Sequence, residues 1–299
     1  MNGLPIELAE TLAAVVDTGT MDAAARRLHI TPSAVSQRIR TLEDRLGRVL
    51  LVRSKPARTT EAGARVVRLA RQYTLLEHDA LVELGAEGGG GHDGRTVSLP
   101  LAVNADSMAT WFLRPLAEVA RTHGAAFDLH RDDQDFTADL LESGEVVAAV
   151  TSRSEPVAGC RVTPLGTMRY QAVATPDLAE RMRVDAASVP VVDFDRRDDL
   201  QSRWLRGRGV DPARPPRHYV PGSHDFALAV EAGLGWGMLP EVQSAAASGS
   251  GRLERLGGAA IDVPLYWQQW NIESPLLAAT VDAVAREAGR VLRAPLSRR

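Results

Sequence analysis

The sequence predicts a mixed α/β protein in two parts, a small helical module followed by a long helix and a larger two-lobed body. Three observations predict this arrangement. Apolar residues recur at helical spacing between residues 4 and 46. The stretch GAEGGGGHDG at 85–94 has the composition of a flexible linker. From residue 96 onward, strand-like and helix-like segments alternate, as they do in mixed α/β domains.

The length and composition narrow the class of protein. With 299 residues the chain is too long for one average domain. No apolar run approaches the roughly 18 residues that span a bilayer, and no secretory signal is visible. The single cysteine, Cys160, cannot form an intramolecular disulfide, and we expect it to be a small buried hydrophobe. We therefore expect a cytoplasmic, nucleoid-associated protein without a membrane partner.

Charge is distributed unevenly along the chain. The net charge is −3, yet residues 23–60 contain nine basic side chains and only two acidic ones. A basic segment on an acidic body predicts one anion-binding module attached to a different kind of domain.

The N-terminal segment has the start and stop signals of three short helices. A helix over 4–18 is followed by a second helix that Thr20 can cap. After a turn at 29–31, proline at the first position begins a third helix over 32–46, and Gly47 ends it. Two short helices joined by a tight turn predict a helix-turn-helix.

The third helix carries a polar face opposite its apolar stripe. Ser33, Ser36, Gln37 and Arg40 share this face at helical spacing. Hydroxyl groups suit phosphates, glutamine can read adenine and arginine can read guanine, so the face predicts entry into a major groove. The alternative is an ordinary solvated amphipathic helix.

Residues 49–59 read as a short β-hairpin wing with basic side chains about its tip, which can contact phosphates or the minor groove. A solvated loop is the alternative. The side chains that we expect to contact DNA in the helix and the wing are Thr31, Pro32, Ser33, Ser36, Gln37, Arg38, Arg40, Arg53, Lys55 and Arg58.

A long helix is expected over 61–84. Its apolar residues recur at alternating steps of three and four, as in a coiled-coil seam, and a lone helix of this length needs a partner. Self-pairing would give a dimer with two recognition helices, and packing on the chain's own body is the alternative. The residues of this seam are Val66, Leu69, Tyr73, Leu76, Ala80 and Leu84.

The body alternates between the two kinds of element. Strands or extended segments are expected at 96–103, 126–132, 145–152, 161–176, 189–194, 217–221 and 263–272. Helices are expected at 107–122, 136–144, 223–233 and 275–292.

The stretch AAARRLHITPSAVSQRIRTLEDRLGRVLLVR at 23–53, followed by RTTEAG at 58–63, resembles LysR-type transcriptional regulators. AGLGWGMLP at 232–240 extends the resemblance into the body. It implies a winged helix-turn-helix, a linker helix that forms a homodimer, a tendency to homotetramers, and a two-lobed effector domain like that of periplasmic binding proteins. The expected segments are 1–60 (DNA-binding domain), 61–84 (linker helix), 85–94 (hinge) and 95–299 (effector domain, with lobe 1 at about 95–165 and 270–299 and lobe 2 at about 166–269).

NADSMATWF at 104–112, DDQDFTADLLESG at 132–144 and VPLYWQQW at 263–270 look like the LysG/ArgP branch, whose members sense basic amino acids. This resemblance implies lysine or arginine as the effector and a basic-amino-acid exporter gene as the target. The implied partners are promoter DNA and RNA polymerase, without a cofactor. The glycine-rich linker and the segment 223–224 depart from the pattern and leave the pocket selectivity open.

A basic amino acid needs one receptor for its carboxylate and at least one carboxylate for its cationic groups. The Ser107 hydroxyl and nearby backbone N–H groups can serve the first need, with helix capping as the alternative. Three aspartates clustered where a strand ends can serve the second, with a solvated acidic loop as the alternative. The expected effector contacts are Asp106, Ser107, Asp132, Asp133, Asp135, Thr151, Ser152, Asp195, Ser223, His224 and Trp267.

Other functions are less well supported by the residues. The triplet SHD at 223–225 is no catalytic triad by sequence alone, and no P-loop, HExxH or GxGxxG after a strand is present, so we expect no enzyme. The acidic cluster lacks neighbouring histidines, which argues against a transition metal. Two alternatives remain: an architectural or replication-origin DNA-binding protein, and a regulator of the same type with another effector.

Overall fold

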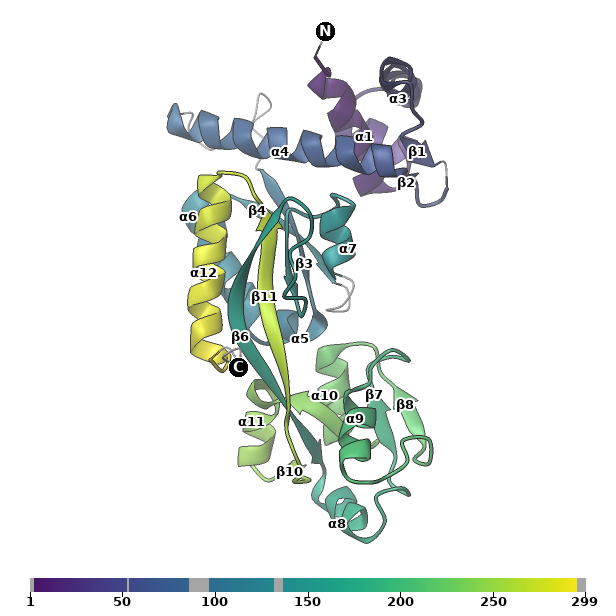
Figure 1. Ribbon diagram of the computed structural model, residues 1–299, viewed down its shortest axis with the longest axis vertical. Coiled ribbons are helices and arrows are strands. Elements are labelled where there is room, and N and C mark those ends of the chain that lie inside the picture. Colours follow the sequence, from purple (N-terminus) through teal and green to yellow (C-terminus); the bar gives the residue numbers. More distant parts are fainter. Residues whose placement is uncertain (1–2, 53, 86–96, 132–136, 295–299) are drawn as a thin grey trace.

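We describe the protein from a computed structural model that covers residues 3–52, 54–85, 97–131 and 137–294. A small helical module lies at one end, the long helix α4 crosses beneath it, and two lobes follow one below the other (Figure 1). The expected class, mixed α/β with an N-terminal helix-turn-helix and a two-lobed body, is confirmed.

The N-terminal module forms because each helix has a defined start. The Thr20 hydroxyl accepts a hydrogen bond from the backbone N–H of Ala23, and Thr31 does the same for Ala34, each at 3.2 Å. Gly47 ends the third helix in a left-handed conformation. The elements are α1 (Ile6–Thr18), α2 (Met21–Leu28), α3 (Pro32–Leu46) and the wing strands β1 (Leu51–Val52) and β2 (Arg58–Thr59).

Helix α4 (Glu61–Glu83) presents three different faces. Val66, Val67 and Ala70 belong to the core of the helix-turn-helix module, whereas Leu75 belongs to the core of the first lobe. A third face is apolar but exposed, and it consists of Leu69, Tyr73, Leu76, Ala80 and Leu84. The predicted seam thus lies largely in solvent, except for Val66.

A seven-stranded sheet runs through the body in the order β10-β6-β11-β5-β3-β4, with β9 paired to β6. Strand β3 is parallel to β4 and β5, whereas β11 is antiparallel to β5 and β6. The first lobe consists of β3 (Ser98–Val103), β4 (Ala126–Arg131), β5 (Ala148–Thr151), α5 (Ala105–Ser107), the π-helical turn η1 (Met108–Phe112), α6 (Leu113–His123), α7 (Thr137–Glu142) and α12 (Pro275–Val291).

Two long strands connect the lobes (Figure 1). They are β6 (Cys160–Ala174) and β11 (Ile261–Trp270), which pair along their length with one irregularity between Leu265 and Tyr266. The second lobe adds β7 (Val191–Asp193), β8 (Arg217–Tyr219), β9 (Gly237–Pro240), β10 (Glu254–Arg255), α8 (Pro176–Val184), α9 (Leu200–Gly207), α10 (Ser223–Glu231) and α11 (Glu241–Gly249). Over the ranges described above, no helix has the length and apolar character needed to cross a membrane.

Candidate DNA-binding face and effector cavity

The polar face of α3 is open to solvent. Ser33, Gln37 and Arg40 are exposed and Ser36 is half-buried, while the opposite side of the helix is buried through Val35 and its neighbours. This face is therefore not covered by another element of the protein, as a helix that enters a DNA groove requires.

One residue predicted for this face is directed elsewhere. Arg38 is half-buried and donates a hydrogen bond through Nη1 to Thr11 Oγ1 of α1 at 3.3 Å. The cause is helix geometry, because position 38 lies far around α3 from Ser33 and Gln37. Arg38 thus joins α3 to α1 at the flank of the recognition face, and its contact with DNA stays a prediction.

At the start of α3, Thr31 and Pro32 are exposed, and the Thr31 hydroxyl lies 2.9 Å from that of Ser33. The wing is held to the same helix by Glu43. Its Oε1 accepts the backbone N–H groups of Leu50 at 2.8 Å and Leu51 at 3.3 Å.

The wing carries Lys55 and Arg58, and both side chains are exposed. Arg53 lies outside the described residues. The recognition helix and the wing therefore present basic and polar groups from two rigidly connected elements.

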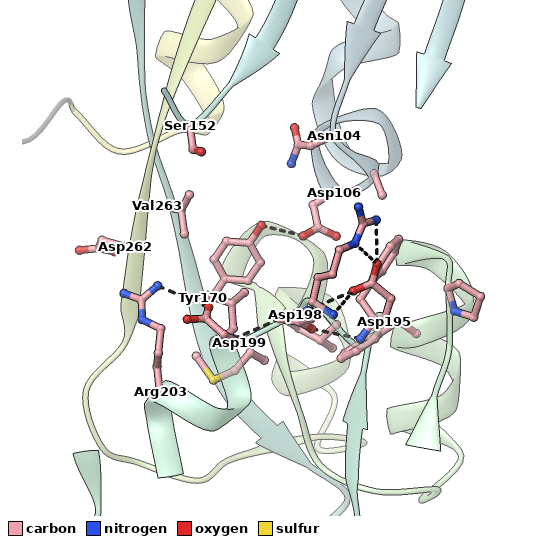
Figure 2. A pocket seen from close by; sticks show the side chains of 18 of the residues that line it. Asn104, Asp106, Ser152, Tyr170, Asp195, Asp198, Asp199, Arg203, Asp262 and Val263 are labelled. Carbon is pink, nitrogen blue, oxygen red and sulfur yellow. Dashed lines mark hydrogen bonds and ion pairs between the residues drawn. The ribbon is translucent and has the colours of Figure 1, made fainter. Parts of the chain in front are cut away.

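A cavity of about 550 Å³ lies between the lobes. Its walls come from the segment after β3, from β6 and β11, from the loop before α9, and from α10 (Figure 2). This volume is in the range that binds small molecules. The aspartates and arginines that line it are Asp106, Arg131, Asp195, Arg197, Asp198, Asp199, Arg203 and Asp262.

Asp106 is the central acidic group of the cavity. Its Oδ2 accepts a hydrogen bond from the Tyr170 hydroxyl at 2.6 Å, and the Ser223 hydroxyl also bonds to this carboxyl group. Burial raises the pKa of Asp106, and the two hydroxyl donors offset part of that rise. Across the described ranges, no lysine or arginine forms an ion pair with it. The site thus contains a half-buried carboxylate whose natural complement is a cation.

The loop before α9 supplies further carboxylates. Asp195 accepts the backbone N–H of Arg197 at 2.7 Å and pairs with its guanidinium at 3.0 Å. Burial works to raise the pKa of Asp195, but these bonds outweigh it and the pKa is lowered. Asp198 accepts the backbone N–H groups of Phe194 at 3.0 Å and Leu200 at 3.1 Å, and burial raises its pKa.

Two arginines pair with acidic groups on other walls of the cavity. Arg203 lies 3.9 Å from Asp199, and both side chains are exposed. Arg169 holds Asp262 through two hydrogen bonds of 2.6 Å, which lower the pKa of Asp262. The cavity is lined by both acidic and basic groups, so both ends of a zwitterionic molecule can find a complement there.

The structure brings only some of the predicted effector residues together. Asp106, Ser152 and Asp195 line the cavity, and Ser223 lies behind Asp106. His224 is exposed and lines no part of the cavity. Asp132, Asp133 and Asp135 lie outside the described residues.

Two predicted hydroxyls are buried beside the cavity without lining it. Thr151 accepts the backbone N–H of Arg153 at 3.1 Å. Ser107 is fully buried, and within the described ranges its Oγ has no hydrogen-bond partner.

The expectation that Trp267 faces the cleft is wrong. Its side chain is fully buried, stacks at 6.3 Å from the ring of Phe112, and donates to Gln269 Oε1 at 2.7 Å. Gln268 and Trp270 are also fully buried, so both faces of β11 are covered here. Strand alternation therefore cannot assign either face to a cleft.

Sequence reasoning missed several residues that line the cavity, namely Asn104, Arg131, Tyr170, Asp198 and Arg203. Asn104 and Arg131 each stand where a parallel strand ends, which is a signal that could have found them. Among the described residues, no group of histidine, cysteine or acidic side chains is arranged to hold a metal ion.

Comparison with known proteins gives matches along the whole chain. Residues 6–64 match the family "Bacterial regulatory helix-turn-helix protein, lysR family", and residues 92–289 match the "LysR substrate binding domain". The "Lysine export transcriptional regulatory protein LysG" of Corynebacterium glutamicum is 43% identical over 296 residues, which is 97% of this chain and 99% of that protein.

Two solved structures are also similar. ArgP from Mycobacterium tuberculosis has a TM-score of 0.82 and 42% identity, over 98% of this chain and 99% of that chain. Full-length LysG from Corynebacterium glutamicum with bound effector Arg has a TM-score of 0.76 and 41% identity, over 98% of this chain and 100% of that chain.

Proposed function

Because the chain belongs to the LysR family of bacterial transcriptional regulators, we propose that it regulates transcription in response to a basic amino acid, arginine or lysine, bound between its lobes. The observation that carries this proposal is Asp106, a half-buried carboxylate in a small-molecule cavity without a cationic partner among the described residues. A guanidinium or ammonium group would supply that partner. The arginine bound to the similar LysG structure supports the same ligand class.

The arrangement of charges suggests how the ligand lies. Its side-chain cation would approach Asp106 under the hydroxyls of Tyr170 and Ser223. Its carboxylate would approach Arg131 or Arg203, which are exposed and line the same cavity. Such a ligand contacts both lobes, so it would favour one relative orientation of the lobes over others.

Calorimetric titration of the full chain tests the effector class. We expect arginine and lysine to bind, and norleucine, which resembles lysine without its terminal charge, to bind at least about tenfold more weakly. Agmatine is arginine without its carboxylate, so its affinity tests in the same way whether Arg131 or Arg203 binds that carboxylate. Binding of norleucine as tight as that of lysine would contradict the proposal.

For the DNA target, we propose that the exposed face of α3 reads bases in the major groove and that Lys55 and Arg58 contact the DNA backbone from the wing. The relative named as a lysine export regulatory protein supports an exporter gene as the target. Genome-wide binding in the presence and absence of arginine would locate the operators. Binding spread without promoter preference would instead favour an architectural protein.

We further propose that the exposed apolar face of α4 pairs with the same face of a second copy, giving a homodimer and, through the effector domains, a tetramer. An apolar stripe of this length on a soluble surface indicates a covered interface. Leu76→Glu should convert dimers into monomers in analytical ultracentrifugation. Val184→Glu is the matched control, because Val184 is exposed on α8, away from the seam. Unchanged assembly of the Leu76 variant would exclude this interface.

A further inference from the structure

The loop before α9 places one arginine–aspartate pair inside the effector cavity, and the proposed function gives neither side chain a role. Asp195 and Arg197 both line the cavity. The guanidinium of Arg197 donates to Asp195 Oδ2 through Nη2 at 3.0 Å and through Nε at 3.2 Å. We call Asp195 and Arg197 the internal pair.

The carboxylate of the internal pair is fixed by the backbone. Asp195 Oδ1 accepts the backbone N–H groups of Arg197 at 2.7 Å and of Asp198 at 3.1 Å. Aspartate favours turns of this kind, and these two bonds need no side chain at position 197. The position of Asp195 Oδ2 is therefore set independently of the guanidinium bonded to it.

The guanidinium of the internal pair lies partly in solvent. The side chain of Arg197 is 53% exposed, whereas that of Asp195 is 26% exposed. An ion pair at such an exposure changes an equilibrium constant by a factor of about five at most, because water and salt screen it and the long side chain loses freedom. Another cation that enters the cavity can therefore compete with Arg197 for Asp195.

Other carboxylates of the cavity are less available to a ligand. Both oxygens of Asp198 accept backbone N–H groups of the loop, at 3.0 and 3.1 Å. Both oxygens of Asp262 accept hydrogen bonds of 2.6 Å from Arg169, and Asp199 is largely exposed to water. Asp195 binds its arginine through one oxygen alone and at longer distances than Asp262 does, so its cation is the easier of the two to displace.

The proposed effector carries a second cation that Asp195 can receive. Arginine and lysine have an α-ammonium group as well as a charged side chain, and Asp106 is the partner proposed for the side chain. Asp106 belongs to the first lobe and Asp195 to the second, and both line the same cavity (Figure 2). An ammonium group donates to a carboxylate as a guanidinium does. The Arg197 side chain therefore makes the contact that the α-ammonium group would make.

Resting on that proposed function, we propose that Asp195 is the subsite for the α-ammonium group and that Arg197 competes with the effector for it. The subsite is open only in the fraction of molecules whose Arg197 side chain is turned away, and the apparent affinity for the effector is reduced by that fraction. The internal pair would then set the effector concentration at which the cavity fills. Arg197 is thus an affinity-determining residue whose removal strengthens binding.

Titration calorimetry of the full chain with Arg197→Gln tests the competition. Glutamine keeps the backbone N–H that fixes Asp195 and removes the competing cation. We expect arginine to bind about three- to fivefold more tightly to this variant than to wild type. The desamino analogue of arginine, which has the guanidinium and the carboxylate but no α-ammonium group, should bind both proteins alike.

Three results would overturn the proposal. Weaker binding of both ligands would mean that Arg197 holds the ligand carboxylate. An equal gain for both ligands would mean that the lost positive charge acts on the whole cavity, and no change for either would mean that Arg197 does not compete. If arginine and lysine bind neither wild type nor the variant, the proposed function fails as well, whereas binding to wild type without a gain in the variant contradicts the competition alone.

A matched ion pair on the same lobe controls for the loss of an arginine. Arg252 lies 3.1 Å from Glu231, their side chains are 58% and 29% exposed, and neither of the two lines the cavity. Arg252→Gln should therefore leave the affinity for arginine unchanged. A gain as large as that of Arg197→Gln would count against a role specific to the internal pair.

A double-mutant cycle identifies the partner of the α-ammonium group. Asp195→Asn keeps an oxygen for the backbone N–H groups but has no charge, so Arg197→Gln should bring no gain in that background. A gain that persists there would overturn the assignment of the subsite. Arg197→Ala removes the same guanidinium and should repeat the gain, which excludes an effect of glutamine itself. Circular dichroism shows whether each variant is folded.

Discussion

The recognition face and the effector cavity are built in opposite ways. Ser33, Gln37 and Arg40 come from two turns of one helix, stand exposed and act without a shared network. Asp106 in the first lobe, by contrast, depends on Tyr170 from β6 and on Ser223 from α10 of the second lobe. One surface is a local product of helix geometry, whereas the other exists only when distant segments meet.

This difference predicts how binding at each site responds to substitution of its side chains. Side chains on the recognition face should contribute separately, because they lie apart in solvent and share no partner. Groups around Asp106 should be coupled, because they share one carboxylate and one cavity. Substitutions in the two regions can test this contrast.

The largest effect is expected from Asp106→Asn. The substitution keeps the size of the side chain but removes the charge that would pair with the ligand cation, so arginine should bind about 10- to 150-fold more weakly, from about 1.5–3 kcal/mol for a charged hydrogen bond. Titration calorimetry measures the change. Asp282→Asn, on the exposed side of α12, is the matched control. An unchanged affinity in the Asp106 variant would remove this residue from the site.

The coupling around Asp106 can be measured directly. Tyr170→Phe deletes the hydroxyl that bonds to Asp106, and it should weaken arginine binding in the wild-type background more than in Asp106→Asn. A double-mutant cycle from the same titrations gives the coupling energy, which we expect to exceed about 0.5 kcal/mol. Additive effects would mean that the hydroxyl acts independently of the carboxylate.

On the recognition face, Gln37→Ala should cost about 1–3 kcal/mol on the specific operator and relax base preference at one position. Binding to random duplex DNA should change little, since a base contact carries sequence information and a phosphate contact does not. Fluorescence anisotropy with both duplexes makes the comparison. Equal losses on the two duplexes would show that Gln37 does not read a base.

Two arginines of the same helix allow a finer comparison. Arg40→Ala should reduce operator affinity by several-fold, whereas Arg38→Ala should have a smaller effect on DNA, because Arg38 bonds to Thr11 at the flank. Any phosphate contact made by Arg40 would also lower the slope of log affinity against log salt by about one. A larger loss of operator affinity for Arg38→Ala than for Arg40→Ala would show that Arg38 contacts DNA.

The same contrast explains which features could be predicted from the sequence. The helices and wing of the module follow from apolar period, caps and glycines within a few residues of one another, and the exposed face follows from α3 alone. Arg38 lies away from Ser33 and Gln37 around the helix, which sets it at the flank of that face beside Thr11. In the cavity, Asp106, Ser152 and Asp195 were found as polar residues near strand ends. Tyr170 was not, since one aromatic residue within the long strand β6 carries no local sign that it points into a cavity.

The second lobe was also harder to predict. Its helices α8, α9 and α11 have nine residues or fewer, so each gives little periodic signal. The loop before α9, which carries Asp195 and Asp198, derives its shape from side-chain bonds to backbone N–H groups. These contacts join residues only two to four positions apart, so the loop is built from local turns of the kind that aspartates favour. Aspartate occurs in turns of several shapes, so the residue type alone does not say which N–H groups it will bond.

The smallest expected effect concerns pH. Burial raises the pKa of Asp106, so the folded chain retains a proton that the unfolded chain releases at lower pH. The contribution of this group to stability is therefore present at acid pH and is lost as pH rises from the ordinary pKa of 3.8 through the raised folded value. The Asp106→Asn variant has no carboxyl group to ionise at this position, so it does not lose this stability as pH rises. At neutral pH and without ligand it should therefore melt at a slightly higher temperature than wild type, although it binds arginine weakly.

Arginine should act on the wild-type protein in the opposite sense. A bound cation stabilises the ionised carboxylate, so arginine affinity should rise as pH increases through the folded pKa of Asp106 and then level off. Thermal melts of both proteins across this pH range, with and without arginine, measure both trends. A wild-type melting temperature that arginine raises equally at all pH values, or raises as much in the Asn variant, would show that the ligand cation binds elsewhere. The cavity would then be organised around Asp198, whose pKa is also raised by burial and which lies on the second lobe alone.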